Sequence, residues 1–254
     1  MAHPARIWDY WLGGKDNFAA DRLAAERVLE AMPAMGPIAR AGRAFLVTAV
    51  HHLAADQGIR QFLDIGTGLP TASNTHEVAQ QAAPGSRIVY VDNDPIVLTH
   101  ARALLTSDVA GTTAYVDADL RDTGKILAEA RTTLDFRQPI ALMLLAVTHF
   151  IPDDEDPWGI VAELMAPLAS GSYLVLSHVS SDIDARGQVD ATRRYNTSSA
   201  VPIHPRSRAE VTRFFGGLEI LEPGVVPLGH WGPGPLDREP RRGLPTWTAV
   251  GRKP

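Results

Sequence analysis

Three aspartates in similar surroundings indicate where this chain of 254 residues binds a ligand. Asp64 stands in the run DIGTGLP, Asp92 in VYVDNDP and Asp119 in DADLRD, and each comes near the end of a short apolar stretch. A carboxylate at Asp64 can receive an ammonium group, one at Asp92 can accept from both hydroxyls of a ribose, and one at Asp119 can accept from an exocyclic amine. Their order along the chain favours a ligand that joins an amino acid to an adenosine.

The glycines that follow Asp64 distinguish between two classes of cofactor. Gly66 and Gly68 let the backbone approach a ligand closely, and Thr67 lies between them. Thr71, however, stands where a dinucleotide fingerprint has its third glycine. An acid at position 64 would also place negative charge beside a pyrophosphate. S-adenosylmethionine has no phosphate and presents an ammonium, a sulfonium, a ribose and an adenine, so it fits this pattern better than NAD does.

The expected cofactor site extends to residues that adjoin the same apolar stretches. Three of them are Asn93, Leu120 and Ala146. The alternative interpretation is that Asp92 and Asp119 only cap helices or turns. Because three suitable sites occur in order, each near the end of an apolar stretch, the cofactor interpretation is preferred.

Short apolar runs alternate with helical stretches from residue 60 onward, and this alternation positions the aspartates. Strands are expected at 61–66, 87–94, 112–119, 140–147 and 172–179. Helices are expected between them at 71–85, 95–107, 123–133 and 157–168. The alternation predicts an α/β fold with a doubly wound, mostly parallel sheet covered by helices on both faces. Ligands bind such sheets beyond the carboxyl ends of the strands, where the three aspartates fall.

The first part of the chain is helical instead. Amphipathic helices are expected at 19–32 and 37–57, because apolar residues recur there at helical spacing. Residues 1–58 are therefore expected to form a helical extension or lid, and residues 59–254 the core of one compact domain.

The last part of the chain departs from the alternation as well. A helix at 206–215 precedes strand candidates at 218–224 and 246–252. A long loop rich in Pro and Gly joins these strands instead of a helix. This connection favours an antiparallel end to the sheet.

Composition excludes several kinds of protein. The net charge is −5 with both signs interspersed, which argues against nucleic acid as a partner. The absence of cysteine excludes disulfides, thiolate metal sites and cysteine nucleophiles, and it favours a reducing cytoplasm. We expect no signal peptide, and the apolar run at 140–147 is too short to span a bilayer, so no membrane partner is expected.

The quoted motifs resemble a known group of enzymes. FLDIGTGLP, VYVDNDP and DADLRD are similar to motifs I, II and III of class I S-adenosylmethionine-dependent methyltransferases. Three further stretches resemble one actinobacterial family of S-adenosyl methyltransferases, formerly a domain of unknown function: ARIWDYWLGGKDNFAADR, GLPTASNTHEVAQ and RSRAEVTRFFGGLEILEPGVV. The resemblance covers essentially the whole chain. It implies a Rossmann-like seven-stranded sheet whose last strand is antiparallel, with S-adenosylmethionine as cofactor and S-adenosylhomocysteine as product.

The chain lacks several motifs, and their absence reduces the range of methyl acceptors that can be expected. Without cysteine, the covalent route to cytosine C5 is excluded. No Asn-Pro-Pro-aromatic motif follows the fourth strand, so methylation of adenine or glutamine amino groups is not expected. That strand end offers no carboxylate either, and the acidic run at 153–156 is better explained as a complement to a helix dipole, so no metal is expected.

Two histidines are candidates for a general base, which helps only where the nucleophile must lose a proton. His149 lies just past the fourth strand and is preferred, while His178 at the end of the fifth is second. The alternative is that either one is a hydrogen-bonded residue at a helix entry or in the core.

The segment WDYWLGGKDNF at residues 8–18 combines aromatics, a double glycine and polar residues. We expect it to cover the open side of the cofactor site, with Tyr10, Gly14 and Asn17 in contact with cofactor or substrate. Trp8 and Trp11 are expected to dock the first helices onto the sheet.

The sequence thus favours a methyltransferase that acts on an O- or N-nucleophile of a small molecule, with secondary metabolism as one setting. The alternatives are a non-catalytic regulatory protein that binds the cofactor and, less favoured, an NAD(P)-dependent oxidoreductase. The acceptor molecule and the oligomeric state do not follow from the sequence.

Overall fold

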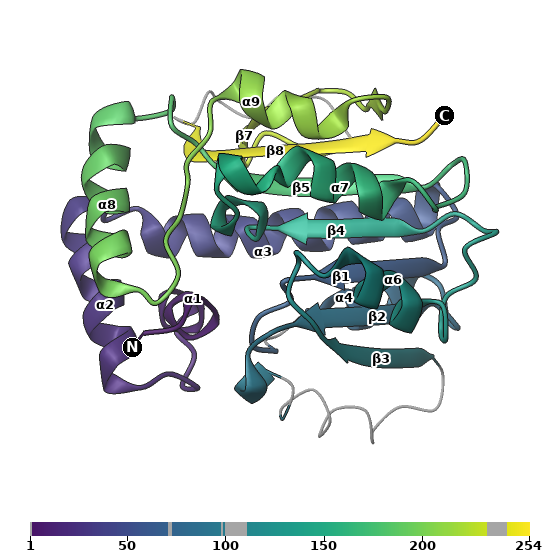
Figure 1. Cartoon of the computed structure of the whole chain (residues 1–254), viewed down its shortest axis with the longest axis horizontal. Helices are drawn as coiled ribbons and strands as arrows, with labels where there is room; N and C mark the ends of the chain where they lie inside the picture. The colour runs from purple at the N-terminus through teal and green to yellow at the C-terminus, as the bar shows by residue number, and fades with distance from the viewer. Residues whose placement is uncertain (1, 71–72, 98, 100–110, 233–242) are drawn as a thin grey trace.

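The computed structural model describes residues 2–70, 73–97, 99, 111–232 and 243–254. One sheet lies at its centre, with strand order β3-β2-β1-β4-β5-β8-β6 and with β7 also paired to β8 (Figure 1). The strands are β1 Gln61–Ile65, β2 Arg87–Asp92, β3 Thr112–Asp117, β4 Ala141–Leu145, β5 Tyr173–Val179, β6 Glu219–Ile220, β7 Val226–Leu228 and β8 Leu244–Arg252.

Strand direction agrees with the prediction. Strands β1 to β5 pair in parallel, and β8 pairs antiparallel with β5, β6 and β7. The mostly parallel sheet with an antiparallel last strand is confirmed. The sheet has eight strands where the resemblance implied seven, because the three-residue β7 is added beside β8. Its residues belong to the stretch rich in Pro and Gly, where so short a strand leaves no periodicity to detect.

The helices include two that the sequence did not predict. The described helices are α1 Pro4–Leu12, α2 Ala19–Ala31, α3 Met35–His51, α4 Thr75–Ala82, α6 Thr123–Ala130, α7 Pro157–Met165, α8 Ala185–Ser198 and α9 Arg208–Thr212. A π-helical turn, His52–Asp56, prolongs α3. The new helices are α1 and α8. The helix expected at 95–107 falls largely outside the described residues.

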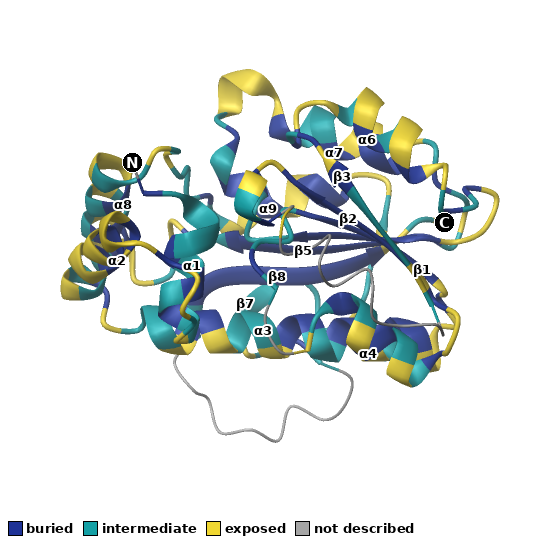
Figure 2. Ribbon diagram, turned by 90° about the horizontal axis from the view of Figure 1, so that it is seen from below, coloured by how far each residue is buried: buried dark blue, intermediate teal, exposed yellow. Residues whose placement is uncertain are grey.

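The core has two halves, one on each face of the sheet, because successive strand residues point to opposite faces. Phe62 and Met143 pack with α2, α3 and α4 on one face. Leu63 and Leu142 pack with α6, α7 and α9 on the other. Figure 2 shows α6, α7 and α9 above the buried strands and α3 and α4 below them, with α2 beyond one end of the sheet beside α8.

Helix α1 forms for recognisable local reasons. Pro4 occupies the first turn, where its fixed φ suits a helix and no amide proton is needed. Gly13, with φ of +82°, ends the helix in the left-handed conformation. Ile7 is buried against the first core half, together with residues of α2 and α3.

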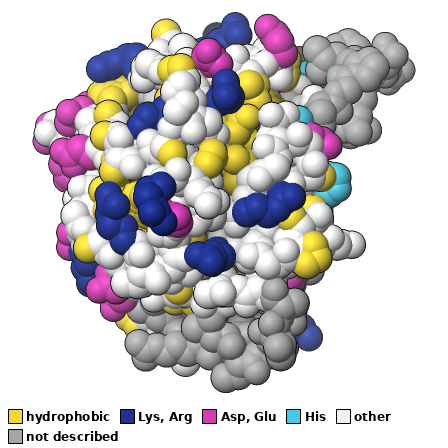
Figure 3. Space-filling view, turned by 90° about the vertical axis from the view of Figure 1, so that its right-hand side faces the viewer, with side chains coloured by type: hydrophobic (Ala, Val, Ile, Leu, Met, Phe, Trp, Pro, Cys, Tyr) yellow, Lys and Arg dark blue, Asp and Glu magenta, His cyan; other side chains and the backbone are white. Residues whose placement is uncertain are grey.

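The surface at the amino ends of the parallel strands carries several separate Lys and Arg side chains rather than one continuous basic area (Figure 3). None of the helices in the described part of the chain combines the length and apolar character needed to cross a bilayer.

Candidate functional site

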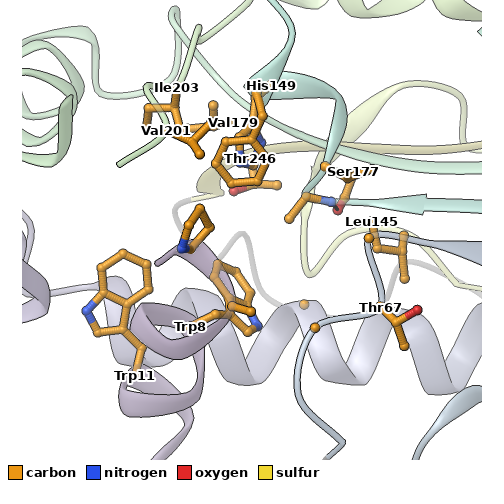
Figure 4. A pocket seen from close by; sticks show the side chains of 18 of the residues that line it. Trp8, Trp11, Thr67, Leu145, His149, Ser177, Val179, Val201, Ile203 and Thr246 are labelled. Carbon is orange, nitrogen blue, oxygen red and sulfur yellow. Dashed lines mark hydrogen bonds between the residues drawn. The ribbon is translucent and has the colours of Figure 1, made fainter. Parts of the chain in front are cut away.

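A cavity of about 300 Å³ lies at the carboxyl ends of the parallel strands and reaches to α1 and α8. The arrow of β4 in Figure 1 points toward these helices. Figure 4 shows Thr67, Leu145 and Ser177 on the strand side of the cavity, with Trp8 and Trp11 of α1 across from them. The residues proposed from the sequence that line it are Asp64, Gly66, Thr67, Gly68, Asp92, Asn93, Asp119, Leu120, Ala146 and His149.

The turn after β1 presents backbone to the cavity. Gly66 has φ of +76°, and a Cβ there would lie 2.5 Å from the Val147 side chain. Gly68 has φ of +66°, and its Cβ position has no described atom within 4 Å. Positive φ angles favour glycine at both positions. Of these two glycines, Gly68 is therefore the one whose Cβ position is free of described atoms.

The chain after β4 is held in a strained conformation beside the same cavity. Ala146 has φ of +55°, in the left-handed region that costs a residue with a side chain about 1 kcal/mol. Its amide donates to the carbonyl and the hydroxyl of Ser177, at 3.1 and 3.0 Å. These two hydrogen bonds from β5 hold the turn in place.

Asp64 is a buried carboxylate with one strong hydrogen bond. Thr75 Oγ1 donates to its Oδ2 at 2.6 Å. Burial raises the pKa of Asp64 to about 6, against the lowering effects of Thr75 and of the nearby Arg43 guanidinium. A cationic group placed beside Asp64 would offset this cost of burial and favour the ionised form.

Asp92 joins the ends of β1 and β2. The amides of Gly68 and Asp94 donate to its Oδ2 and Oδ1 at 2.8 and 2.9 Å. Burial raises the pKa of Asp92, and these two hydrogen bonds oppose the effect. Each oxygen can still accept a further hydrogen bond from a ligand hydroxyl.

Asp119 lies at the more exposed edge of the cavity. Asn93 Nδ2 donates to its Oδ2 at 2.9 Å, and the backbone and side chain of Arg121 donate to its Oδ1 at 3.0 and 3.1 Å. Burial raises the pKa of Asp119, but the hydrogen bonds from Arg121 and Asn93 outweigh it and hold the pKa below its usual value. Arg121 also pairs with Glu155.

The two candidate histidines differ in their surroundings. His149 lines the cavity, and its Nδ1 has no hydrogen-bond partner in the described part of the chain. Burial, with smaller effects of His178 and Arg206, lowers the pKa of His149 well below its usual value, so its ring is neutral.

His178 is not part of the cavity lining. Its Nδ1 donates to the Val179 carbonyl at 2.8 Å, and its Nε2 accepts from buried Arg206 at 2.9 Å. Burial lowers the pKa of His178 to about 3. It is thus the hydrogen-bonded core residue of the alternative interpretation.

The whole chain matches a known protein family. The family model for S-adenosyl methyltransferase matches residues 1–254. The chain belongs to this family. The predicted class of enzyme, an S-adenosylmethionine-dependent methyltransferase, is thereby confirmed, together with its cofactor. None of the curated proteins that were compared matches the chain.

Solved structures agree with the family. A DUF574 family protein from Streptomyces avermitilis is 46% identical with a TM-score of 0.94, and the match covers 100% of this chain and 98% of that one. A proposed methyltransferase from Thermobifida fusca YX is 39% identical with a TM-score of 0.90, covering 99% and 95%. Magnesium protoporphyrin IX methyltransferase from Synechocystis PCC 6803, solved with bound SAM, is 13% identical with a TM-score of 0.56, covering 98% and 90%. This last likeness concerns the fold alone.

In this methyltransferase, three residues proposed from the opening segment lie outside the cavity lining. Tyr10 donates from its hydroxyl to Glu26 at the surface, at 3.0 Å. Asn17 Nδ2 donates to buried Asp9 at 2.8 Å and to the Gly14 carbonyl at 3.1 Å. A Cβ at Gly14 would collide with the Asp9 carboxylate. The structure therefore gives these residues contacts within the chain, and Asp9 organises the turn that contains two of them.

The tryptophans of the same segment pack against the core, as expected from the sequence, and they also line the cavity. Trp8 and Trp11 both line the cavity, with ring centroids 5.9 Å apart in an edge-to-face arrangement. Both also pack against the core half that contains α2 and α3. They therefore connect the helical extension to the cavity.

The start of the methyltransferase chain is tied to the end of β2. Arg6 donates to Asp21 of α2 at 3.0 Å and to Asp94 at 2.9 Å. His3 Nδ1 lies 2.9 Å from the same Asp94 oxygen. Since the Asp94 amide donates to Asp92, α1 is connected to the proposed ribose site through two hydrogen bonds.

Helix α8 contributes cavity residues that the sequence did not predict. Gln188, Ala191, Thr192 and Tyr195 line the cavity from this helix. Their spacing of three, one and three residues places them on one face, which is a signal that the sequence does contain.

Across the described ranges, no three His, Asp or Glu side chains gather closely enough to form a metal site.

Proposed function

We propose that this methyltransferase transfers its methyl group to an oxygen or a nitrogen of a small molecule. The enclosure of the cavity carries the proposal: α1 and α8 line it opposite the strand ends, and its volume of about 300 Å³ matches small-molecule sites. An acceptor must fit between these helices and the cofactor, which favours a metabolite over a polymer.

The residues at the strand ends suit S-adenosylmethionine. Asp64 would receive the ammonium, and Asp92 the ribose hydroxyls. Gly66, Thr67 and Gly68 would supply backbone beside the methionine part, and Asn93, Asp119, Leu120 and Ala146 would surround the remainder. The fit is supported by a buried carboxylate that no described Lys or Arg hydrogen-bonds and by the open space at Gly68.

The bound cofactor supplies a methyl group on a sulfonium, whose sulfur takes back the electron pair of the broken carbon–sulfur bond. The chain contributes alignment and exclusion of water, which account for much of the rate of such a displacement. His149 is the proposed catalytic residue, because a neutral imidazole in the cavity can accept a hydrogen bond from the nucleophile. As the new bond to the methyl carbon forms, the proton of the nucleophile would move to the His149 imidazole.

Residues 1–58 form the proposed lid of the core at 59–254. Trp8 and Trp11 line the cavity, and Arg6 ties α1 to Asp94. We also propose a cytoplasmic setting, which the cysteine-free sequence supports.

An acceptor screen tests the proposed function. The protein is incubated with methyl-labelled S-adenosylmethionine and, separately, with a metabolite library, total RNA and a protein extract. We expect label in one or a few small molecules. Label that appears only in RNA or in protein would contradict the proposal.

A further inference from the structure

The face of α8 that lines the cavity has no role in the cofactor assignment. Gln188 is only 4% exposed, and its Oε1 atom is buried without a hydrogen-bond partner among the described residues. Thr192 lies one turn further along α8, and its Oγ1 is also buried without a hydrogen-bond partner among the described residues. Because buried polar atoms in proteins nearly always have a partner, the pair indicates a ligand group that is still to be accommodated.

The chemistry of this pair specifies the ligand group. A glutamine amide and a threonine hydroxyl can each donate and accept. A ligand hydroxyl or N–H group can therefore satisfy either side chain, with rotation of the amide or of the hydroxyl as needed.

Other parts of the same cavity lining are aromatic and aliphatic. Trp8 and Trp11 line the cavity from α1, and Tyr195 lines it from α8. Figure 4 shows Val201 and Ile203 on the opposite side of the cavity from the two tryptophans. Aromatic side chains prefer an aromatic partner in stacked or edge-to-face contact, so this lining suits a planar ring.

The charged side chains that line the cavity come from elements other than α8. Apart from histidines, the charged side chains of the described lining are Asp9, Arg43, Asp64, Asp92, Asp119 and Arg121. None of them belongs to α8. Asp9 already accepts hydrogen bonds from the Asp16 amide and from Asn17, at 3.0 and 2.8 Å. A charged group placed against α8 would lose its hydration without an opposite charge, which is costly.

We propose that α8 binds the methyl acceptor, and that the acceptor is a neutral aromatic molecule whose hydroxyl or N–H group hydrogen-bonds to Gln188 and Thr192. This inference rests on the proposed function, because it takes the strand ends to be occupied by the cofactor. It adds the chemical class of the acceptor and the residues that select it.

Three matched probes test the inference: p-cresol, p-xylene and 4-methylbenzoate, which share one ring and differ in a hydroxyl, a methyl and a carboxylate. Their dissociation constants are measured by ligand-observed NMR titration of the protein saturated with S-adenosylhomocysteine. The variants are Gln188→Leu and the isosteric Thr192→Val. The control is Val189→Ala, on the exposed side of the same helix.

We expect the preference for p-cresol over p-xylene to fall about tenfold in Gln188→Leu, and severalfold in Thr192→Val, because a hydrogen bond to a buried group is lost. Val189→Ala should leave the preference unchanged. We expect 4-methylbenzoate to bind at least tenfold more weakly than p-cresol to the unmodified protein.

Separate outcomes identify which proposal fails. An unchanged preference in both variants, or 4-methylbenzoate binding as tightly as p-cresol, would overturn the acceptor site while the cofactor assignment stands. Failure of the unmodified protein to bind S-adenosylhomocysteine would overturn the proposed function and this inference with it. Unchanged affinity for S-adenosylhomocysteine in the variants shows that they are folded.

Discussion

The amide of Gly68 donates a hydrogen bond of 2.8 Å to Oδ2 of Asp92. This contact joins the glycine turn after β1 to the end of β2, the two segments proposed to hold the methionine part and the ribose of the cofactor. The Asp94 amide binds the other oxygen of the same carboxylate at 2.9 Å. Asp92 is thus fixed in orientation before a ligand arrives, so little ordering is needed when the ribose binds.

The first prediction concerns this carboxylate. Asp92→Ala should weaken the binding of S-adenosylhomocysteine by about 1–3 kcal/mol, the scale of hydrogen bonds to a charged group. Isothermal titration calorimetry measures the change. Asp117→Ala is the matched control, because Asp117 is paired with Asp92 in the neighbouring strand but is exposed. Equal affinities for the Asp92 variant and the unmodified protein would remove the ribose assignment.

The second prediction follows from the pKa of about 6 that burial gives Asp64. Below pH 6 the free protein holds Asp64 protonated, and an ammonium must displace that proton in order to bind. Affinity for S-adenosylhomocysteine should therefore fall as the pH drops below 6, by up to about tenfold per pH unit. Titrations from pH 5 to 8 measure it. Asp64→Asn should flatten the profile, and a variant that keeps the slope would contradict the role of Asp64.

The same shift predicts a trend in folding stability. The folded carboxyl ionises near pH 6 and the unfolded one near 3.8, so between these values the folded chain holds more protons. The contribution of Asp64 to stability is therefore full below pH 3.8 and is lost as the pH rises through 6. Relative to the unmodified protein, Asp64→Asn should become more stable as the pH rises through this window. Urea unfolding at pH 5 and pH 7 checks the sign, and a difference between the two proteins that does not change with pH would oppose it.

The third prediction concerns Arg6, which lies between Asp21 and Asp94. The two carboxylates are 1% and 2% exposed, so Arg6→Ala would leave both buried with less compensation. We expect a loss of about 3–5 kcal/mol in the free energy of unfolding. Urea denaturation measures it, with Arg137→Ala as control, since Arg137 pairs with Asp135 at the surface. Equal effects of the two variants would refute the proposed connection of α1 to Asp94.

The fourth prediction separates catalysis from binding at His149. His149→Gln should lower turnover of the acceptor found in the screen by about 10²-fold, with unchanged affinity for S-adenosylhomocysteine. Because burial lowers the pKa of His149 well below its usual value, its titration should add no inflection to the rate profile between pH 6 and 9. His51→Gln, at an exposed position of α3, is the control. Full turnover by the His149 variant would contradict a catalytic role of His149. The rate would then come from alignment of the substrates alone.

The strand-end residues could be predicted because their signals are local. Asp64 and Asp92 stand at the ends of apolar runs of strand length, and β1 and β2 end at Ile65 and Asp92. Parallel strands in one sheet bring such ends together without any knowledge of side-chain contacts. The cavity lining around these residues follows from that topology.

The contacts of the opening segment could not be predicted in the same way. Tyr10, Gly14 and Asn17 are polar or glycine residues beside aromatics, but their partners are Glu26 and Asp9, which no local pattern selects. Helix α1 also carried a signal that was overlooked, since proline in the first turn and glycine after the last are typical of short helices.

Helix α8 was missed for a different physical reason. Its buried side includes Gln188 and Tyr195, so the usual apolar stripe of a core-facing helix is weak. That side lines a cavity rather than a fully packed core. The polar residues that weaken the sequence signal are those proposed to bind the acceptor.

A crystal structure of the protein with S-adenosylhomocysteine would test the proposed cofactor site most directly. We expect the ribose hydroxyls within hydrogen-bond distance of Asp92, the ammonium beside Asp64, and the sulfur directed toward the part of the cavity lined by His149 and α8. A ligand bound elsewhere, or bound here with its ribose away from Asp92, would contradict the proposed site.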